Sequence, residues 1–143
     1  MKEIRKNFKL NNFTNSSYNL YFNNMSLVVL DIETTGLRPA YDNLILSGFL
    51  TVKNGVASFV QFFAENEADE YKVIKSTINM LSSFDFMLTY NGSSFDIPFL
   101  KAIALRHGLN FCNHIYNLDL YKVIKNSSYI KEYVPNLKQK TME

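Results

Sequence analysis

The chain has 143 residues, 47% hydrophobic and 15% aromatic, enough to bury the core of one globular domain, and this composition excludes an intrinsically disordered chain. A single cysteine, Cys112, excludes an internal disulfide bond. No apolar run approaches the roughly 18 residues of a membrane span, and polar sequence follows the basic N-terminus, so we expect a cytoplasmic protein with no membrane partner.

The net charge of +2 is unevenly distributed along the chain. Residues 1–30 and 101–143 are basic, whereas residues 31–70 carry seven acidic and only two basic side chains. An acidic region between basic flanks suits a cation site beside a surface that binds a polyanion, although ordinary surface charge produces the same pattern.

Residues 1–25 are rich in asparagine, serine and aromatic side chains. We expect them to form an extension that lies on the domain or wraps around it, because their aromatic content argues against full disorder. The aromatic residues are Phe8, Phe13, Tyr18, Tyr21 and Phe22. Residues 26–143 then form the domain itself.

Three strands are expected at the start of this domain. The sequence SLVVLDIE at 26–33 is short, apolar and β-branched, as is typical of a strand buried on both faces. Residues 44–52 and 56–63 also read as strands, and the Asn54-Gly55 pair between them is a hairpin signal. The three segments therefore predict an antiparallel meander.

The rest of the chain alternates helices with strands. We expect helices at about 68–81 and 95–107, strands at 85–90 and near 115–118, a helix from about Asp119 and a last helix from about Asn136. The order β-β-β-α-β-α-β-α predicts an α/β fold with a mixed sheet and helices packed on it.

Asp31 and Glu33 are the sharpest chemical signal. Residues i and i+2 of a strand point to the same face, so the two carboxylates stand side by side at the end of an apolar strand. Their proximity is costly unless a cation lies between them, and an all-oxygen site suits Mg²⁺ or Mn²⁺. The alternative is a strand end with two solvent-exposed acids.

The segment DIETTGL continues with small residues after the two acids. We expect Thr34, Thr35, Gly36 and Leu37 to contact substrate, with Gly36 allowing a ligand to come close to the backbone.

A second polar segment, YNGSSFDIPFL at 90–100, lies at the expected turn from a strand into a helix. Asp96 falls in the first turn of this helix, where an acid can serve a site or simply complement the helix dipole. Asn91 and the backbone around Gly92 are candidates for substrate binding. Phe95 can stack on a base or pack in the core.

DIETTGL resembles the first motif of the DEDD (DnaQ-like) 3′→5′ exonucleases, and YNGSSFDIPFL resembles their second motif. The second is especially similar to the form in family-B DNA polymerase proofreading domains and in the YprB-like branch of the ribonuclease H-like superfamily. The resemblance covers residues 26–143 and implies a ribonuclease H-like fold, with a five-stranded mixed sheet and helices on its faces. It also implies hydrolysis of DNA or RNA from the 3′ end.

The resemblance further implies roles for three carboxylates. Asp31 takes the position that bridges two Mg²⁺ or Mn²⁺ ions, and Glu33 binds one ion and orients the attacking water. Asp96 takes the position of a metal ligand or of a partner that holds the site together. Hydrolysis with two metal ions requires this clustering, because one ion activates water while the other stabilises the leaving oxygen.

The chain departs from the family pattern after the second motif. The family uses a fourth carboxylate on a late helix, preceded by a Tyr or His, and the later acids here are only Asp119, Glu132 and Glu143. We expect the domain to be truncated before its third motif and to turn over weakly, with Asp119 as the first candidate if a fourth ligand is present. The missing helix then exposes part of the sheet, which the N-terminal extension, a second copy or a partner domain is expected to cover.

Several basic residues near the C-terminus are candidates for phosphate contacts or ordinary surface residues: Lys101, Arg106, Lys122, Lys125, Lys131, Lys138 and Lys140. His107 and His114 do not fit a catalytic role. The competing functional hypothesis is a non-catalytic nucleic-acid-binding or scaffolding domain of the same fold, and a domain within a longer polymerase or helicase is a third.

Overall fold

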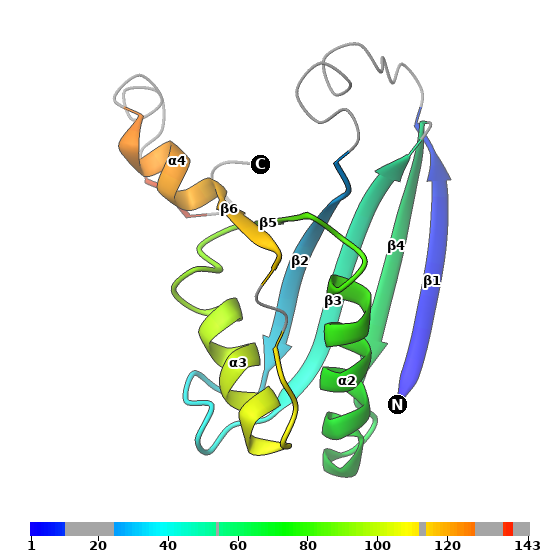
Figure 1. The fold of residues 1–143 in the computed structure, drawn as a ribbon, viewed down its shortest axis with the longest axis vertical. Coiled ribbons are helices and arrows are strands. Elements are labelled where there is room, and N and C mark those ends of the chain that lie inside the picture. Colours follow the sequence, from blue (N-terminus) through cyan, green and yellow to red (C-terminus); the bar gives the residue numbers. More distant parts are fainter. Residues whose placement is uncertain (11–24, 54, 112–113, 128–135, 139–143) are drawn as a thin grey trace.

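The computed structural model describes residues 1–10, 25–53, 55–111, 114–127 and 136–138. The strands are β1 (Lys2–Lys9), β2 (Leu27–Thr34), β3 (Leu44–Lys53), β4 (Val56–Phe63), β5 (Phe86–Thr89) and β6 (Tyr116–Asp119). The helices are the short 3-10 helix η1 (Glu67–Asp69), α2 (Glu70–Leu81), α3 (Asp96–Arg106) and α4 (Leu120–Asn126). The strands form one mixed sheet in the spatial order β1-β4-β3-β2-β5-β6, with α2 and α3 on the same face (Figure 1).

The predicted antiparallel meander is confirmed by β2, β3 and β4. Lys53 pairs with Val56 across the hairpin, and Gly55 has φ 74°, a left-handed conformation that short hairpin turns favour. β5 and β6 then add in parallel to β2, as βα units do. The α/β class and the mixed sheet predicted from the sequence are therefore confirmed.

The sheet has six described strands, whereas the sequence predicted five. The additional strand, β1, pairs antiparallel with β4 along its whole length, from Lys2 opposite Phe63 to Lys9 opposite Val56. Its many charged residues concealed it in the sequence, and they are tolerated because β1 is an exposed edge strand held mainly by backbone pairing. The rest of the expected N-terminal extension, residues 11–24, lies outside the described residues.

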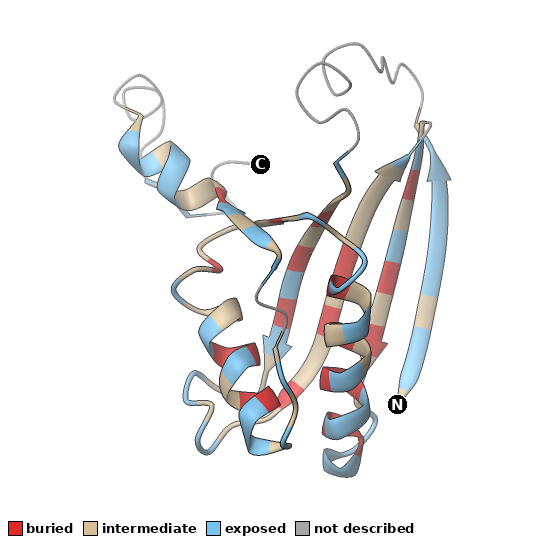
Figure 2. Ribbon diagram, in the orientation of Figure 1, coloured by how far each residue is buried: buried red, intermediate tan, exposed pale blue. Residues whose placement is uncertain are grey.

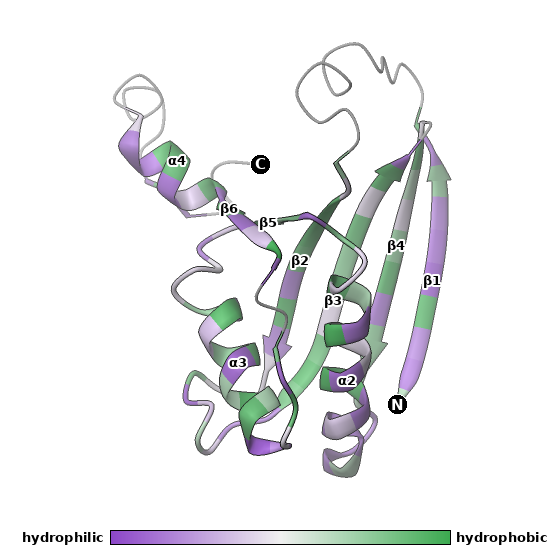
Figure 3. Cartoon of the chain, viewed as in Figure 1, coloured by the Kyte–Doolittle hydropathy of each residue, from purple (hydrophilic) through white to green (hydrophobic). Residues whose placement is uncertain are grey.

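The core lies between the sheet and the two helices on it. Val28, Leu30 and Ile32 of β2 are buried against apolar side chains of α2 and α3, such as Ile74 and Leu100. Buried residues recur along the strands and on the inner sides of both helices in Figure 2, and Figure 3 colours most of β2 and β3 hydrophobic. Along β2, buried residues alternate with less buried ones, which is the period-2 pattern of a sheet with one covered face.

Two expectations about the elements need correction. β2 is buried on one face only, because Asp31 and Glu33 on its other face are exposed. Residues 136–138 are not helical where a last helix was expected to begin, and residues 139–143 lie outside the described residues. None of the helices in the described ranges has the length and apolarity needed to cross a membrane.

The face of β1, β4 and β3 that points away from α2 is termed the open face. Strand register places its side chains in rows with those of β2, because directly paired residues point the same way. One row contains Glu33, Leu46, Phe63 and Lys2. The next contains Asp31, Gly48, Gln61 and Ile4. The third contains Val29, Leu50, Phe59 and Lys6.

Candidate active site

The strand β2 positions the two acids of the first motif. Its alternation buries Leu30 and Ile32 in the core and turns Asp31 and Glu33 to the opposite, solvent-facing side. The pairing of β2 with β3 shifts register between Glu33 and Thr34, so the regular strand ends directly after the second acid. The apolar half of the strand therefore fixes where both carboxylates stand.

Asp96 approaches the same strand from the first turn of α3. It is buried, and its Oδ1 accepts a hydrogen bond of 3.2 Å from the backbone N–H of Ile32, between the two acids. This N–H needs a partner because the parallel pairing of β5 with β2 ends at Val29. The free edge of β2 thus draws the carboxylate of Asp96 to the place where Asp31 and Glu33 stand.

Among the described residues, no positively charged side chain lowers the pKa of Asp31 or Asp96. Although Asp31 is exposed, the surrounding protein partly removes water from its carboxyl group, which raises its pKa, and the neighbouring charge of Glu33 raises it further. Burial also raises the pKa of Asp96 to about 6, with a further upward contribution from the charge of Asp31. Raised pKa values mean that the ionised forms are disfavoured, and a bound cation reverses this.

Metal-free protein should lose stability as the pH rises from about 4 to about 6, because of Asp96. Its folded pKa lies above the unfolded value, so the protonated carboxyl favours the folded state below about pH 4, and this contribution disappears as the pH rises through about 6. Thermal midpoints measured in EDTA from pH 4 to 8 should show a smaller loss for Asp96→Asn. Parallel profiles for the two proteins would contradict the assignment.

Asp96→Asn suits this comparison because its side-chain oxygen can still accept from Ile32. Several other acids have lowered pKa values and act in the opposite direction, losing stability as the pH falls. The difference between the two proteins, rather than either profile alone, isolates Asp96.

The residues after Glu33 mostly shape their own loop. The hydroxyl of Thr34 donates to the carbonyl of Gly36 at 2.6 Å, and the hydroxyl of Thr35 accepts from the N–H of Asn43 at 2.8 Å. Gly36 packs against the Asp42 carboxylate, which a Cβ at position 36 would meet at 2.6 Å. Leu37 is 78% exposed and therefore projects from the loop into solvent.

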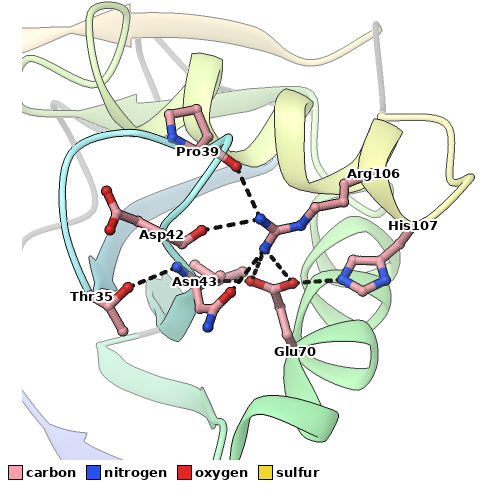
Figure 4. A network of polar contacts seen from close by, with 8 residues as sticks. Thr35, Pro39, Asp42, Asn43, Glu70, Arg106 and His107 are labelled. Atoms are coloured by element: carbon pink, nitrogen blue, oxygen red, sulfur yellow. Dashed lines mark hydrogen bonds and ion pairs between the residues drawn. The ribbon is translucent and has the colours of Figure 1, made fainter.

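A buried acid at the start of α2 holds this loop in place (Figure 4). The Glu70 carboxylate accepts 2.6 Å hydrogen bonds from Arg106 at the end of α3, contacts His107 Nε2 at 2.6 Å and accepts from the Leu44 N–H at 2.8 Å. Arg106 also donates to the carbonyl oxygens of Pro39 and Asp42. Burial by itself raises the pKa of Glu70, but the hydrogen bonds from Arg106, His107 and Leu44 outweigh it and lower the pKa.

This network corrects the expectation for Arg106. Its guanidinium is engaged with Glu70 and with the loop after the first motif, so it is not available as a surface phosphate contact. Nothing local in the sequence indicates this role of Glu70, because its partner Arg106 is 36 residues away.

The second motif forms a tight turn between β5 and α3. Asn91 has φ 62°, a left-handed conformation that asparagine tolerates better than most residues. Asp119 at the end of β6 accepts hydrogen bonds from the N–H groups of Asn91 (2.8 Å) and Ser93 (3.0 Å). Phe95 packs against the core and contacts the ring of Phe99, so the packing alternative holds for it.

Asp119 therefore organises the turn instead of standing free as a fourth ligand. Its buried carboxylate also accepts from Tyr121 N and caps α4. Burial raises its pKa, but the hydrogen bonds from Ser93, Asn91 and Tyr121 outweigh this and lower the pKa, as expected for an acid that stays ionised on N–H donors.

Gly92→Ala should destabilise the protein by about 1–3 kcal/mol, as overpacking of a filled site does. An added Cβ at this buried position would lie 2.5 Å from Thr89 Cβ, an atom that cannot move away without its backbone. Urea unfolding measures the effect. Gly48→Ala is the matched control, because its Cβ would meet nothing closer than 3.6 Å. Equal stability of the two variants would contradict this account of the turn.

The residues fit a hard divalent cation, although no closed metal site is preformed. Among the described residues, no group of three or more His, Cys, Asp and Glu side chains is already gathered around one point. The nearby donors are carboxylates, which suit Mg²⁺ or Mn²⁺ better than softer metals. The raised pKa values of Asp31 and Asp96 are the observation that supports a cation at this place.

The fold is shared with exonucleases and polymerases of known structure. The family-B DNA polymerase of the archaeon Pyrobaculum calidifontis superposes on 71% of this chain with a TM-score of 0.61 and 21% identity, using 16% of its own length. Escherichia coli exonuclease I in complex with a dT13 oligonucleotide superposes on 82% of the chain with a TM-score of 0.61 and 14% identity, using 34% of its length. At these identities the likeness shows the fold alone.

Sequence comparison leads to the same group. A DNA polymerase of Methanocaldococcus jannaschii is 28% identical over 116 residues, which are 76% of this chain and 7% of the polymerase. A PolC-type DNA polymerase III of Ureaplasma parvum is 28% identical over 108 residues, 60% of this chain and 8% of that protein. The chain thus spans less than a tenth of each polymerase. Residues 28–143 match the RNase_H_2 family, and the chain therefore belongs to the RNase H superfamily.

Proposed function

We propose that this chain is a metal-dependent 3′→5′ exonuclease domain that hydrolyses phosphodiester bonds of DNA or RNA. The observation that carries the proposal is the hydrogen bond from the backbone N–H of Ile32, between Asp31 and Glu33, to the carboxylate of Asp96, with the pKa values of Asp31 and Asp96 raised. A module that only binds nucleic acid gains nothing from acids crowded where a phosphate must lie, because like charges repel.

The relatives support the reaction class. One solved form of E. coli exonuclease I contains zinc and single-stranded DNA, and it superposes on 71% of this chain with a TM-score of 0.55. A metal ion in a nuclease of the same fold agrees with the cation that we propose for the carboxylates of this chain. We expect Mg²⁺ or Mn²⁺ in this chain because the donors are oxygen atoms.

Each residue then has a defined task in the proposed site. Asp31 and Glu33 hold the cations from the exposed side of β2, and Asp96 joins them while its hydrogen bond to Ile32 N fixes its position. When bound, the cations supply an activated water and stabilise the leaving oxygen. Glu33 lies at the outer end of the strand, from which its carboxylate orients the attacking water.

The segments on either side of the acids are proposed to bind the substrate. Thr34, Thr35 and Gly36 are tied into the loop by internal hydrogen bonds and packing, so they present backbone groups in a fixed arrangement. The exposed Leu37 offers an apolar contact for a terminal base or sugar. In the second motif, the half-buried Asn91 lies on the turn that leads to Asp96, whereas Phe95 packs against the core.

The test is the polarity of degradation. A 5′-labelled single-stranded oligonucleotide is incubated with excess protein and Mn²⁺, because weak turnover is expected from a site with three proposed carboxylates. Shortening from the 3′ end should appear one nucleotide at a time. It should not begin on a second oligonucleotide whose 3′-terminal linkage is a phosphorothioate. Binding without any shortening, or internal cuts, would instead favour the non-catalytic binding domain or another nuclease type.

A further inference from the structure

The open face carries a groove beside the proposed catalytic carboxylates. The groove crosses β1, β4 and β3 and has a volume of about 690 Å³. Its lining includes two exposed phenylalanines on neighbouring strands, Phe8 (51% exposed) and Phe59 (40% exposed), whose rings meet edge to face with centroids 5.6 Å apart. Large aromatic side chains exposed together on a sheet are unusual unless something covers them.

The groove lies on the same face as Asp31 and Glu33. Asp31 is in one row with Gly48 and Gln61, and Phe59 belongs to the adjacent row. β2 and β4 are two strand spacings apart, which is about 10 Å. Phe59 therefore lies about one or two nucleotide lengths from the carboxylates. A strand whose 3′ end meets Asp31 can therefore continue across this face.

The charges of the open face, where Lys6 lines the groove, suit a polyanion. Lys2 and Lys6 of β1 stand on the open face, and the described open-face positions of β1, β3 and β4 include no acidic side chain. The acid of β1, Glu3, points to the other face and pairs with Arg5. Lysines beside exposed aromatic side chains are the combination that binds single strands, with phosphates on the cations and bases on the rings.

We propose that the open face is a binding platform for single-stranded nucleic acid, with bases stacked on Phe59 and Phe8 and phosphates near Lys6 and Lys2. The polarity of the bound strand rests on the proposed exonuclease function: the 3′ end lies at the carboxylates, and the platform binds the nucleotides that precede it. An apolar protein partner would use the same phenylalanines, but it has no need of the lysines or of a surface continuous with the carboxylates.

The test is equilibrium binding of a labelled single-stranded 12-mer, followed by fluorescence anisotropy in EDTA so that no cleavage occurs. Phe59→Ala should weaken binding by about tenfold, because it removes one base–ring stacking contact. The double variant with Phe8→Ala should bind still more weakly, because it removes a second such contact. Phe59→Leu keeps the apolar volume without the ring and should also bind weakly. Phe59→Tyr should restore binding.

Tyr71→Ala is the matched control. Tyr71 is also 40% exposed and aromatic, but it lies on α2, which covers the opposite face of the sheet. This variant should bind like the unchanged protein. Thermal unfolding of every variant identifies any loss that comes from misfolding, and the pair of Phe59→Leu and Phe59→Tyr remains decisive if Phe59→Ala does not fold.

Two outcomes overturn the platform. One is binding unchanged by the loss of both rings; the other is a dimer, seen by sedimentation, that Phe59→Ala dissociates while oligonucleotide binding persists. Failure of the nuclease function looks different: the 12-mer binds through Phe59 in EDTA but is not shortened when Mn²⁺ is added. If shortening depends on Asp31 but the oligonucleotide binds equally well after both rings are removed, the nuclease function stands and the platform is excluded.

Discussion

Asp31→Asn should reduce Mn²⁺-dependent shortening of a single-stranded oligonucleotide by about three orders of magnitude or more, because metal-ion stabilisation is worth several kcal/mol and each 1.4 kcal/mol is about tenfold in rate. The substitution keeps the size of the side chain but removes the charge that stands beside Glu33 and near Asp96. Single-turnover rates with excess protein measure the loss.

Asp31→Asn should lower the cleavage rate but raise the thermal stability of the metal-free protein. Because the pKa of Asp31 is raised, its charge is unfavourable in the metal-free fold, so Asp31→Asn should unfold at a slightly higher temperature in EDTA. Glu67→Gln, which changes an exposed acid of η1, is the control and should leave both rate and stability unchanged. A loss of activity accompanied by unfolding would show only that Asp31 supports the fold.

Glu70→Ala should lower the free energy of unfolding by about 3 kcal/mol, because removing one partner of a buried ion pair leaves the other uncompensated. The Glu70 side chain is 6% exposed, and its removal leaves both Arg106 and the Leu44 N–H without this acceptor. Broken buried ion pairs typically cost about 3–5 kcal/mol. Since Arg106 is 32% exposed, water relieves part of this cost, and the effect should lie at the lower end of the range. Urea unfolding gives the value.

Two further variants separate charge from hydrogen bonding at this position. Glu70→Gln keeps an acceptor for Leu44 N–H and should cost less than Glu70→Ala. Glu67→Ala removes an exposed acid from the adjoining turn and should be nearly neutral. If Glu70→Ala were as stable as Glu67→Ala, the network in Figure 4 would not hold the loop after the first motif.

The sequence was most informative where local pattern and chemistry coincide. The alternation in β2 was sufficient to place Asp31 and Glu33 on one face, and the Asn54-Gly55 pair located the hairpin. Asp96 was identified by its motif, but its hydrogen bond to Ile32 depends on where β5 stops pairing with β2. That is a property of the assembled sheet and has no local signal.

Long-range polar contacts were the features that the sequence did not predict. Arg106 read as a surface base and Asp119 as a candidate ligand, yet the first pairs with Glu70 and the second accepts backbone N–H groups of the second motif. Strand β1 was missed because its charged residues mask a period-2 pattern, and pairing with β4 supplies the stabilisation that its side chains do not. Each miss reflects a partner more than 25 residues away.

The measurement that tests the central claim most directly is the binding of Mn²⁺, followed by the decrease of the free-ion electron paramagnetic resonance signal as protein is added in the presence of an oligonucleotide. If Asp31, Glu33 and Asp96 hold a catalytic cation, the unchanged protein should deplete free Mn²⁺, whereas Asp31→Asn and Asp96→Asn should deplete it much less at the same concentration. Identical titrations for all three proteins would contradict the account.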